Sequence, residues 1–225
     1  MYVEPDTGVW TKTHPYAIEL RKLLHRDNRT VIVSGISGES SEHMVQRIHK
    51  VLQTTKPTVA IILGGTNELG PPHVTAEMIL NNLKRIHHQV LETSLKINKP
   101  VYTIAMTIPF CDWGGKEGLQ KRLDVNAGLR EFASKCSERI QLIDLENIYD
   151  QKDVNNKVYW SPDRVHFSPK GYDGIGKLIY EKLASFELSS TPSENEVFLK
   201  NCFPSLKTSL AKHVTHHHGL RVDRN

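Results

Sequence analysis

The sequence predicts an α/β/α sandwich, in which helices cover both faces of a parallel β-sheet. Short apolar runs alternate along the chain with segments whose apolar residues recur at helical spacing. Three of the four apolar runs are almost continuously β-branched or apolar, as expected for strands buried on both faces. In this fold class the loops that follow the strands gather at one edge of the sheet, and we expect function at that edge.

The predicted elements follow from these patterns in chain order. The expected strands are residues 30–33, 59–63, 101–106 and 140–145. The expected helices are residues 15–25, 41–53, 76–95, 119–136 and 169–188. In the third helix, Ile79, Leu83 and Ile86 belong to one apolar stripe. The last helix has the clearest start, because Ser168 is a good N-cap residue and Pro169 suits the first helical position.

Length and composition indicate one globular domain. The chain has 225 residues, of which 38% are hydrophobic and 24% are charged. These values fit a domain with a sizeable core, which we assign to residues 1–188. Residues 189–225 are expected to form a polar, mostly disordered tail. The tail contains His216, His217 and His218, but no carboxylate or thiolate adjoins them, so we predict no metal site.

Charge, hydropathy and cysteine content argue against several classes of protein. The net charge is +4, but no basic run is interleaved with aromatic residues, so we predict no nucleic-acid partner. No apolar run approaches the length that spans a membrane. Cys111, Cys136 and Cys202 form no CxxC pair, which favours reduced thiols in a cytoplasmic protein. The N-terminal residues lack the basic and apolar segments of a signal peptide. The oligomeric state cannot be inferred from the sequence.

The most informative motif is Asp163-Arg164-Val165-His166, shortly before the Ser168 N-cap. We call residues 163–166 loop three. A carboxylate three residues from an imidazole can orient it and stabilise its protonated form, so that the imidazole serves as a general base. The spacing also fits an exposed Asp and His ahead of a helix. The catalytic interpretation, with a buried imidazole, therefore depends on the loops that share this edge.

Two further loops supply groups that fit the same chemistry. Loop one, residues 34–40, follows the strand expected at 30–33, and loop two, residues 64–70, follows the strand expected at 59–63. In a parallel sheet both loops converge on one edge. The Gly38 backbone N–H and the Asn67 side-chain amide can together stabilise an oxyanion. Taken singly, each residue also fits an ordinary turn, but all three loops in order favour a shared site.

These loops resemble the SGNH (GDSL-type) hydrolases of flavodoxin-like fold. Residues 36–40 are similar to the family's second motif, and residues 65–68 are similar to its Gly-x-Asn-Asp motif, with Glu68 where Asp is usual. Residues 163–166 are similar to its Asp-x-x-His motif, and His14-Pro15-Tyr16-Ala17 resembles the start of the first helix in esterase-like members. The resemblance spans roughly residues 10–186.

The resemblance implies a flavodoxin-like three-layer sandwich and an esterase that acts on a small-molecule ester. It implies catalytic roles for Asp163 and His166 and an oxyanion hole formed by Gly38 and Asn67. It also implies that the chemistry needs neither a metal nor an organic cofactor. Residues 109–115 follow a strand end, so they either line an acyl pocket or form a surface loop.

The family's nucleophile motif, Gly-Asp-Ser, is absent from the sequence. The family carries it after a first, central strand, yet the residues before His14 contain no apolar strand. Thr7 is one alternative nucleophile, but no buried strand precedes it; Ser37 is another, but it lacks the Gly-x-Ser-x-Gly elbow. Because unpaired strands in a buried sheet are costly, we expect a shortened version of a longer hydrolase. A lost N-terminus could have held a signal peptide.

Three functions follow from these observations. The first is an ester hydrolase scaffold whose attacking serine is missing from the sequence. The second is a non-catalytic module that keeps the pocket and binds a ligand or partner. The third is metal binding through the His-rich tail. Lipid, acetylated sugar and thioester substrates all fit the first function equally well.

Overall fold

The structure is a computed structural model, and it describes residues 2–3, 10–11, 15–27, 29–97, 99–111, 113–184, 186, 198–199 and 202–203. The helices are α1 (Pro15–Leu24), α2 (Ser41–Thr55), α3 (Ala76–Ile97), α4 (Gly115–Lys135), α5 (Leu145–Ile148) and α6 (Pro169–Ala184). Three short 3-10 helices lie in the connections: η1 (His25–Asp27), η2 (Thr66–Glu68) and η3 (Val154–Tyr159).

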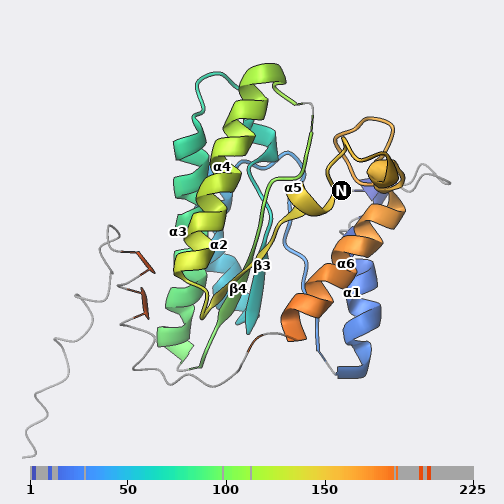
Figure 1. Cartoon of the computed structure of the whole chain (residues 1–225). Helices are drawn as coiled ribbons and strands as arrows, with labels where there is room; N and C mark the ends of the chain where they lie inside the picture. The colour runs from blue at the N-terminus through green and yellow to red at the C-terminus, as the bar shows by residue number, and fades with distance from the viewer. Residues whose placement is uncertain are drawn as a thin grey trace, which may run out of the picture.

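The main sheet has three described parallel strands in the order β3-β4-β5, formed by Val59–Ile62, Tyr102–Met106 and Ile140–Ile143. Helices α2, α3 and α4 lie on one side of it, and α1 and α6 lie on the other (Figure 1). A separate antiparallel pair is formed by β1 (Tyr2–Val3) and β2 (Trp10–Thr11). The predicted α/β sandwich with a parallel sheet is confirmed.

Two hydrophobic clusters hold the three layers together. One joins α1 and α6 to the sheet and includes Leu20, Ile104 and Ile179. The other joins α2, α3 and α4 to the opposite face and includes Ile62, Leu83 and Leu129. All five residues of β4 are buried, whereas β3 and β5 are partly exposed. The core is therefore built around β4, which has a strand on each side and helices on both faces.

Residues 30–33 form no strand, so the first of the four predicted strands is wrong. Ile32 is 58% exposed, and the Val31 carbonyl accepts a hydrogen bond from the Arg21 side chain at 3.1 Å. A β-branched run becomes a strand only where a neighbouring strand completes its hydrogen bonds. No strand described by the structure lies beside these residues as a partner.

The same lack of a neighbour leaves one edge of β3 open. The Tyr102 N–H donates to the Thr58 carbonyl at 2.9 Å, so the backbone groups of Thr58 face β4. In a parallel strand successive residues face opposite neighbours, so the backbone N–H and C=O groups of Val59 and Ile61 face away from β4. Among the described residues, no strand pairs with that edge. An unpaired edge is a template for another strand.

The helix starts agree with the sequence. The Ser40 side chain accepts a hydrogen bond from the His43 N–H at 3.3 Å and caps α2. The Ser168 hydroxyl accepts one from the Gly171 N–H at 3.2 Å and caps α6, as predicted. Loops one and three therefore each end on a capped helix.

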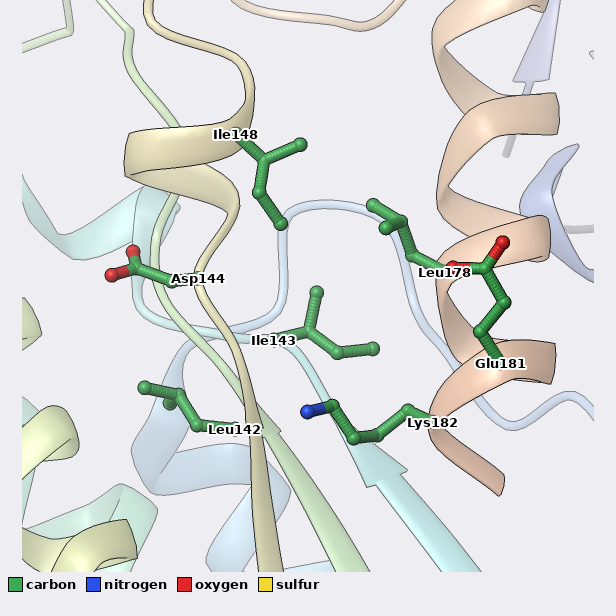
Figure 2. A pocket seen from close by; sticks show the side chains of 7 residues that line it. All are labelled: Leu142, Ile143, Asp144, Ile148, Leu178, Glu181 and Lys182. Carbon is green, nitrogen blue, oxygen red and sulfur yellow. The ribbon is translucent and has the colours of Figure 1, made fainter. Parts of the chain in front are cut away.

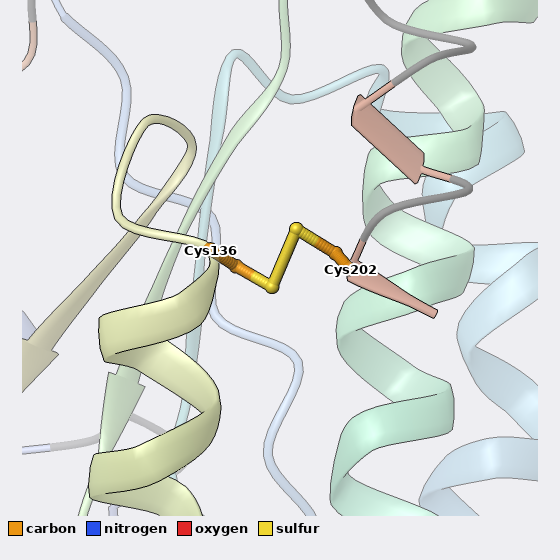
Figure 3. Close-up of a disulfide and its surroundings, with 2 residues drawn as sticks. All are labelled: Cys136 and Cys202. Carbon is orange, nitrogen blue, oxygen red and sulfur yellow. A yellow bond between two sulfur atoms is a disulfide. The ribbon is translucent and has the colours of Figure 1, made fainter. Parts of the chain in front are cut away.

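The C-terminal segment contains a disulfide between Cys136, at the end of α4, and Cys202 (Figure 3). The prediction of reduced thiols is therefore wrong for these two residues, while Cys111 is buried and forms no disulfide within the described residues. Leu199 and Phe203 are buried in a cluster with Cys136. These described residues of the expected tail pack on the domain, whereas residues 216–218 lie outside the described part of the chain.

Within the part of the chain that the structure describes, no helix is both long enough and apolar enough to cross a membrane.

Candidate active site

Loop three holds the acid and the imidazole together. The distance from His166 Nδ1 to Asp163 Oδ2 is 2.7 Å. Oxygen Oδ1 of the same carboxylate accepts the backbone N–H groups of Val165 and His166 at 2.9 and 3.0 Å. Partial burial raises the pKa of Asp163, but the hydrogen bonds from His166 and Val165 outweigh it and hold this pKa below its ordinary value. Asp163 is thus charged at neutral pH and directed at the imidazole.

The prediction that the His166 imidazole is buried is wrong. The His166 side chain is 68% exposed and the Asp163 side chain is 51% exposed. Between them Arg164 adopts a left-handed backbone with φ of 55°, which is uncommon for a residue with a side chain. Gln151 fixes this turn, because it donates to the Arg164 carbonyl at 3.0 Å and accepts from the Arg164 side chain at 3.2 Å. The pair is therefore held in place by its loop, with the imidazole open to solvent.

Loops one and two are joined directly. The Asn67 side-chain amide donates to the Glu39 carbonyl at 2.9 Å, next to Gly38. Gly38 has a positive φ of 76°, and a Cβ placed there would meet nothing within 4 Å. Gly38 is thus exposed, with open space where a side chain would be. The structure brings the loops of both predicted donors together.

The sequence interpretation missed a second contact between these loops. Both oxygens of the Glu68 carboxylate accept hydrogen bonds from Ser41, one from its backbone N–H at 2.6 Å and one from its hydroxyl at 2.7 Å. Glu68 is only 6% exposed and Ser41 is fully buried. Only its place beside Asn67 could have drawn attention to Glu68, because its partner lies 27 residues away.

Loop one is also tied to α2 by an arginine. Arg47 forms an ion pair with Glu39, and it donates to the Ser34 hydroxyl at 2.9 Å and to the Ser34 carbonyl at 2.6 Å. The hydrogen bond with Glu39 raises the pKa of Arg47. Both ends of loop one are therefore held by this one side chain of α2.

Loop three and the segment after β4 both reach the core near loop two. The Val165 side chain packs on the cluster that contains Ile62 and Leu69, so loop three contacts the same cluster as loop two. A Cβ placed on Gly70 would lie 2.7 Å from Trp113 Nε1, so the Trp113 ring covers loop two there. Trp113 is 52% exposed. This contact favours the interpretation that residues 109–115 border the site.

The candidate nucleophiles do not complete the arrangement. Ser37 is exposed, and within the described residues no hydroxyl group forms a hydrogen bond with the His166 ring. Thr7 lies outside the described residues. Asp163, His166, Gly38 and Asn67 therefore stand without an attacking group among the residues that the structure describes.

Partly buried, paired charges connect α4 to the segment that follows β5. Arg130 donates to Asp144 at 2.8 and 2.9 Å and to Glu146 at 2.7 Å, and Arg122 forms a further ion pair with Glu146. Burial raises the pKa of Asp144, but the Arg130 and Thr107 hydrogen bonds outweigh it and lower this pKa overall. The charges are paired, which a buried cluster requires. This cluster is structural support for the edge.

A hollow of about 400 Å³ lies between β5, α5 and α6 (Figure 2). The side chains of Ile143, Ile148 and Leu178 point toward it, and Lys182 reaches it from α6. Asp163, His166, Gly38 and Asn67 do not line it. It is therefore separate from the candidate site. Elsewhere in the described chain, no three His, Cys, Asp or Glu side chains gather as a metal ion would require.

An Asp–His pair held by its own loop, in a parallel α/β sandwich whose loops one and two are joined, fits a hydrolase of the acyl-transfer type. The comparisons with known proteins agree with this class. The model of the GDSL-like lipase/acylhydrolase family matches residues 6–173. This chain belongs to that family. Its sequence contains no Gly-Asp-Ser.

Several solved structures share the fold. A lipase/acylhydrolase from Enterococcus faecalis is 19% identical, with a TM-score of 0.61 over 78% of this chain and 88% of that chain. A GDSL-like lipase from Bacteroides thetaiotaomicron is 19% identical, with a TM-score of 0.59 over 75% and 82%. An acetyl xylan esterase is 18% identical, with a TM-score of 0.57 over 75% and 90%. No curated protein sequence matches the chain.

Proposed function

We propose that this site hydrolyses a small-molecule carboxylic ester. The observation that carries the proposal is the 2.7 Å contact between Asp163 and His166 in loop three, whose Val165 packs on the same cluster as Leu69 of loop two. Asp163 holds the imidazole by Nδ1, which leaves Nε2 for proton transfer. The Gly38 N–H and the Asn67 amide are the proposed oxyanion donors.

The proposed reaction proceeds through an acyl-enzyme. An attacking hydroxyl oxygen forms a bond to the acyl carbon, and its proton passes to His166 Nε2. Gly38 and Asn67 donate hydrogen bonds to the oxyanion, which collapses as His166 returns the proton to the departing alcohol. Water then attacks the acyl carbon, again with His166 as the base. The bond from that carbon to the enzyme oxygen breaks, His166 returns the proton to this oxygen, and the carboxylic acid leaves. No step requires a metal or an organic cofactor.

The attacking hydroxyl is proposed to come from outside the described residues. The free edge of β3 supports this source, because a further strand pairing with Val59 and Ile61 would end beside loops one and two. Residues 30–33, which lack a strand partner in the described chain, would then have one as well. A serine at the end of such a strand would stand at the same edge as His166.

Labelling with a fluorophosphonate tests this function. We expect the purified chain, if it carries the hydroxyl, to hydrolyse p-nitrophenyl acetate and to take up one label. Both signals should disappear in His166→Ala and persist in the matched control His25→Ala, because His25 is an exposed histidine at the end of α1. Mass spectrometry of the labelled peptide then locates the nucleophile. A label on Ser37 would contradict the proposed source.

The second candidate function is a binding module that has the pocket and no attacking group. It is favoured by the lack of any described hydroxyl at the His166 ring. A chain that gives a folded circular-dichroism spectrum but neither label nor turnover would support this function and refute hydrolysis by the chain as written.

The compartment is a separate proposal. Cytoplasmic localisation was predicted from unpaired cysteines, and the Cys136–Cys202 disulfide removes that basis. We propose an oxidising compartment, where such a bond persists. Peptide mapping of the native protein without reduction should recover the two cysteines in one cross-linked species. Recovery of both as free thiols would support the cytoplasm.

A further inference from the structure

Glu68 is a buried carboxylate with two donors from a single residue. Its oxygens accept the Ser41 N–H at 2.6 Å and the Ser41 hydroxyl at 2.7 Å. Asn82 of α3 donates to the same hydroxyl at 3.1 Å and so ties Ser41 to a third element. Burying a charge is costly unless it is hydrogen-bonded. Ser41 lies in the first turn of the 15-residue helix α2, where the helix dipole also favours a negative charge.

Glu68 and its neighbour Asn67 attach loop two to loop one at two points. Asn67 donates to the Glu39 carbonyl at 2.9 Å, while Glu68 binds Ser41, two residues further along. The two attached residues of loop one and α2, Glu39 and Ser41, come one and three residues after Gly38 in the chain. One attachment would leave a hinge between the loops, whereas two fix their distance and their relative angle.

Loop two is itself fixed, so the attachments hold loop one in a set place. Gly65 has a positive φ of 97°, and a Cβ there would lie 2.8 Å from Ile79 and 2.9 Å from Ile108. The turn therefore sits directly on the core. From this turn the backbone enters η2, and the two side chains of Asn67 and Glu68 reach the two ends of the segment 39–41.

We propose that Glu68 is a positioning residue that, through Ser41, fixes the Gly38 N–H and the Asn67 amide relative to each other. The proposal rests on the proposed function, in which these two groups share one oxyanion. Preorganised donors stabilise the developing negative charge without having to move. A small displacement of one donor therefore reduces the stabilisation of the transition state more than the binding of the substrate. The Glu68 side chain is long enough to accept both hydrogen bonds from Ser41. An Asp at this position is one methylene shorter, so it could not accept both unless the backbone of loop two moved.

Steady-state kinetics on the form of the chain that turns over p-nitrophenyl acetate give the first test. In Glu68→Gln and Ser41→Ala we expect kcat to fall roughly 10- to 100-fold, with KM within about twofold of the parent value. Glu68→Asp should lie between these variants and the parent. Glu42→Gln is the matched control, because it removes an exposed carboxylate from the same helical turn and should change neither constant. A purely structural role would lower kcat only in proportion to the folded fraction, which thermal melting measures.

Binding of acetate gives a second test that needs no nucleophile. A carboxylate oxygen can occupy the oxyanion position, and NMR can follow the Gly38 amide and the Asn67 side-chain amide during an acetate titration. We expect both signals to shift together in the parent chain and the affinity to fall about tenfold in Glu68→Gln, an effect of one misplaced donor.

The outcomes separate this proposal from the proposed function. Turnover that is insensitive to Glu68→Gln would overturn the role of Glu68 and leave hydrolysis intact. Absent turnover with Glu68-dependent acetate binding would refute hydrolysis by the chain and support the role of Glu68. Absent turnover with no acetate response at either donor would overturn both.

Discussion

The two halves of the candidate site are held in opposite ways. In loop three every contact to the Asp163 carboxylate comes from two or three residues away, and the side chains are half-exposed or more. In loops one and two the contacts span 27 and 28 residues, and Glu68 and Ser41 are buried. The acid–histidine pair is thus a local structure that its own loop forms. The pair of oxyanion donors exists only because two distant loops meet.

This difference predicts which substitutions change chemistry and which change the fold. Changes in loop three should affect turnover and leave stability almost untouched, since little there is buried. Changes at the base of loop two should affect both. The three experiments below can break or sharpen that contrast, and they are ordered by the size of the expected effect.

The largest effect is expected for Asp163→Asn. The Asn oxygen can still accept the backbone N–H groups of Val165 and His166, so the loop keeps its shape, but the charge that orients and stabilises the imidazole is lost. For a triad acid the loss is on the order of 10³- to 10⁴-fold in kcat. Turnover of p-nitrophenyl acetate and the thermal midpoint should be measured together. A fall of less than tenfold would show that the carboxylate is not used, and a large drop in the midpoint would contradict the local character of loop three.

A pair of glycine substitutions probes the other half. Both Gly65 and Gly38 have positive φ, but only at Gly65 would a Cβ also collide with Ile79 and Ile108. We expect Gly65→Ala to lower the free energy of unfolding by about 2–4 kcal/mol, from backbone strain and overpacking together. Gly38→Ala should lower it by roughly 1–2 kcal/mol, from strain alone. Urea titrations of both variants measure this difference. Equal losses would mean that loop two is not seated on the core as described.

Acid should destabilise the core through a buried histidine. Burial lowers the pKa of His87 from 6.5 to about 3, and its Nδ1 lies 2.8 Å from the Thr103 hydroxyl. The unfolded chain takes up this proton near pH 6.5 and the folded chain does not, so the stability from neutral His87 is complete above pH 6.5. It is then lost at up to about 1.4 kcal/mol per pH unit as the pH falls toward 3. Asp163, with a pKa below 3.8, contributes a loss only under more acidic conditions.

Urea midpoints at pH 7 and pH 5 separate the two groups. The His87→Asn variant can keep the bond to Thr103 and should show a smaller decrease between these pH values than the parent chain. Asp163→Asn should show the same decrease as the parent. Identical behaviour of His87→Asn and the parent would mean that His87 protonates in the folded state without cost.

Much of the fold was predictable because it depends on local pattern. The apolar runs at 59–63, 101–106 and 140–145 became β3, β4 and β5, and the helical stripes became α1, α2, α3, α4 and α6. The run at residues 30–33 has the same β-branched character and formed no strand. Its side chains suit a strand, but a strand also needs a neighbour, and the described chain offers none.

The disulfide shows the same limit from another side. Cys136 and Cys202 lie 66 residues apart, and this spacing does not predict a disulfide. They meet because Leu199 and Phe203 are buried in the cluster that also contains Phe132 and Ile140. Aromatic contacts of Phe203 with His88 and Phe132 fix that approach. Packing between residues far apart in the sequence therefore decided that these two cysteines form a disulfide.

By itself, the sequence determined the layered α/β architecture, the capped helix behind loop three and the pairing of Asp163 with His166. All of these follow from interactions between residues a few positions apart, whose geometry the chain fixes wherever it lies. Only the tertiary structure decided that the imidazole is exposed, that no described strand pairs with the outer edge of β3 and that Glu68 binds Ser41. Those features depend on contacts between segments far apart in the chain, and the local pattern of residues does not show which distant segments will be in contact.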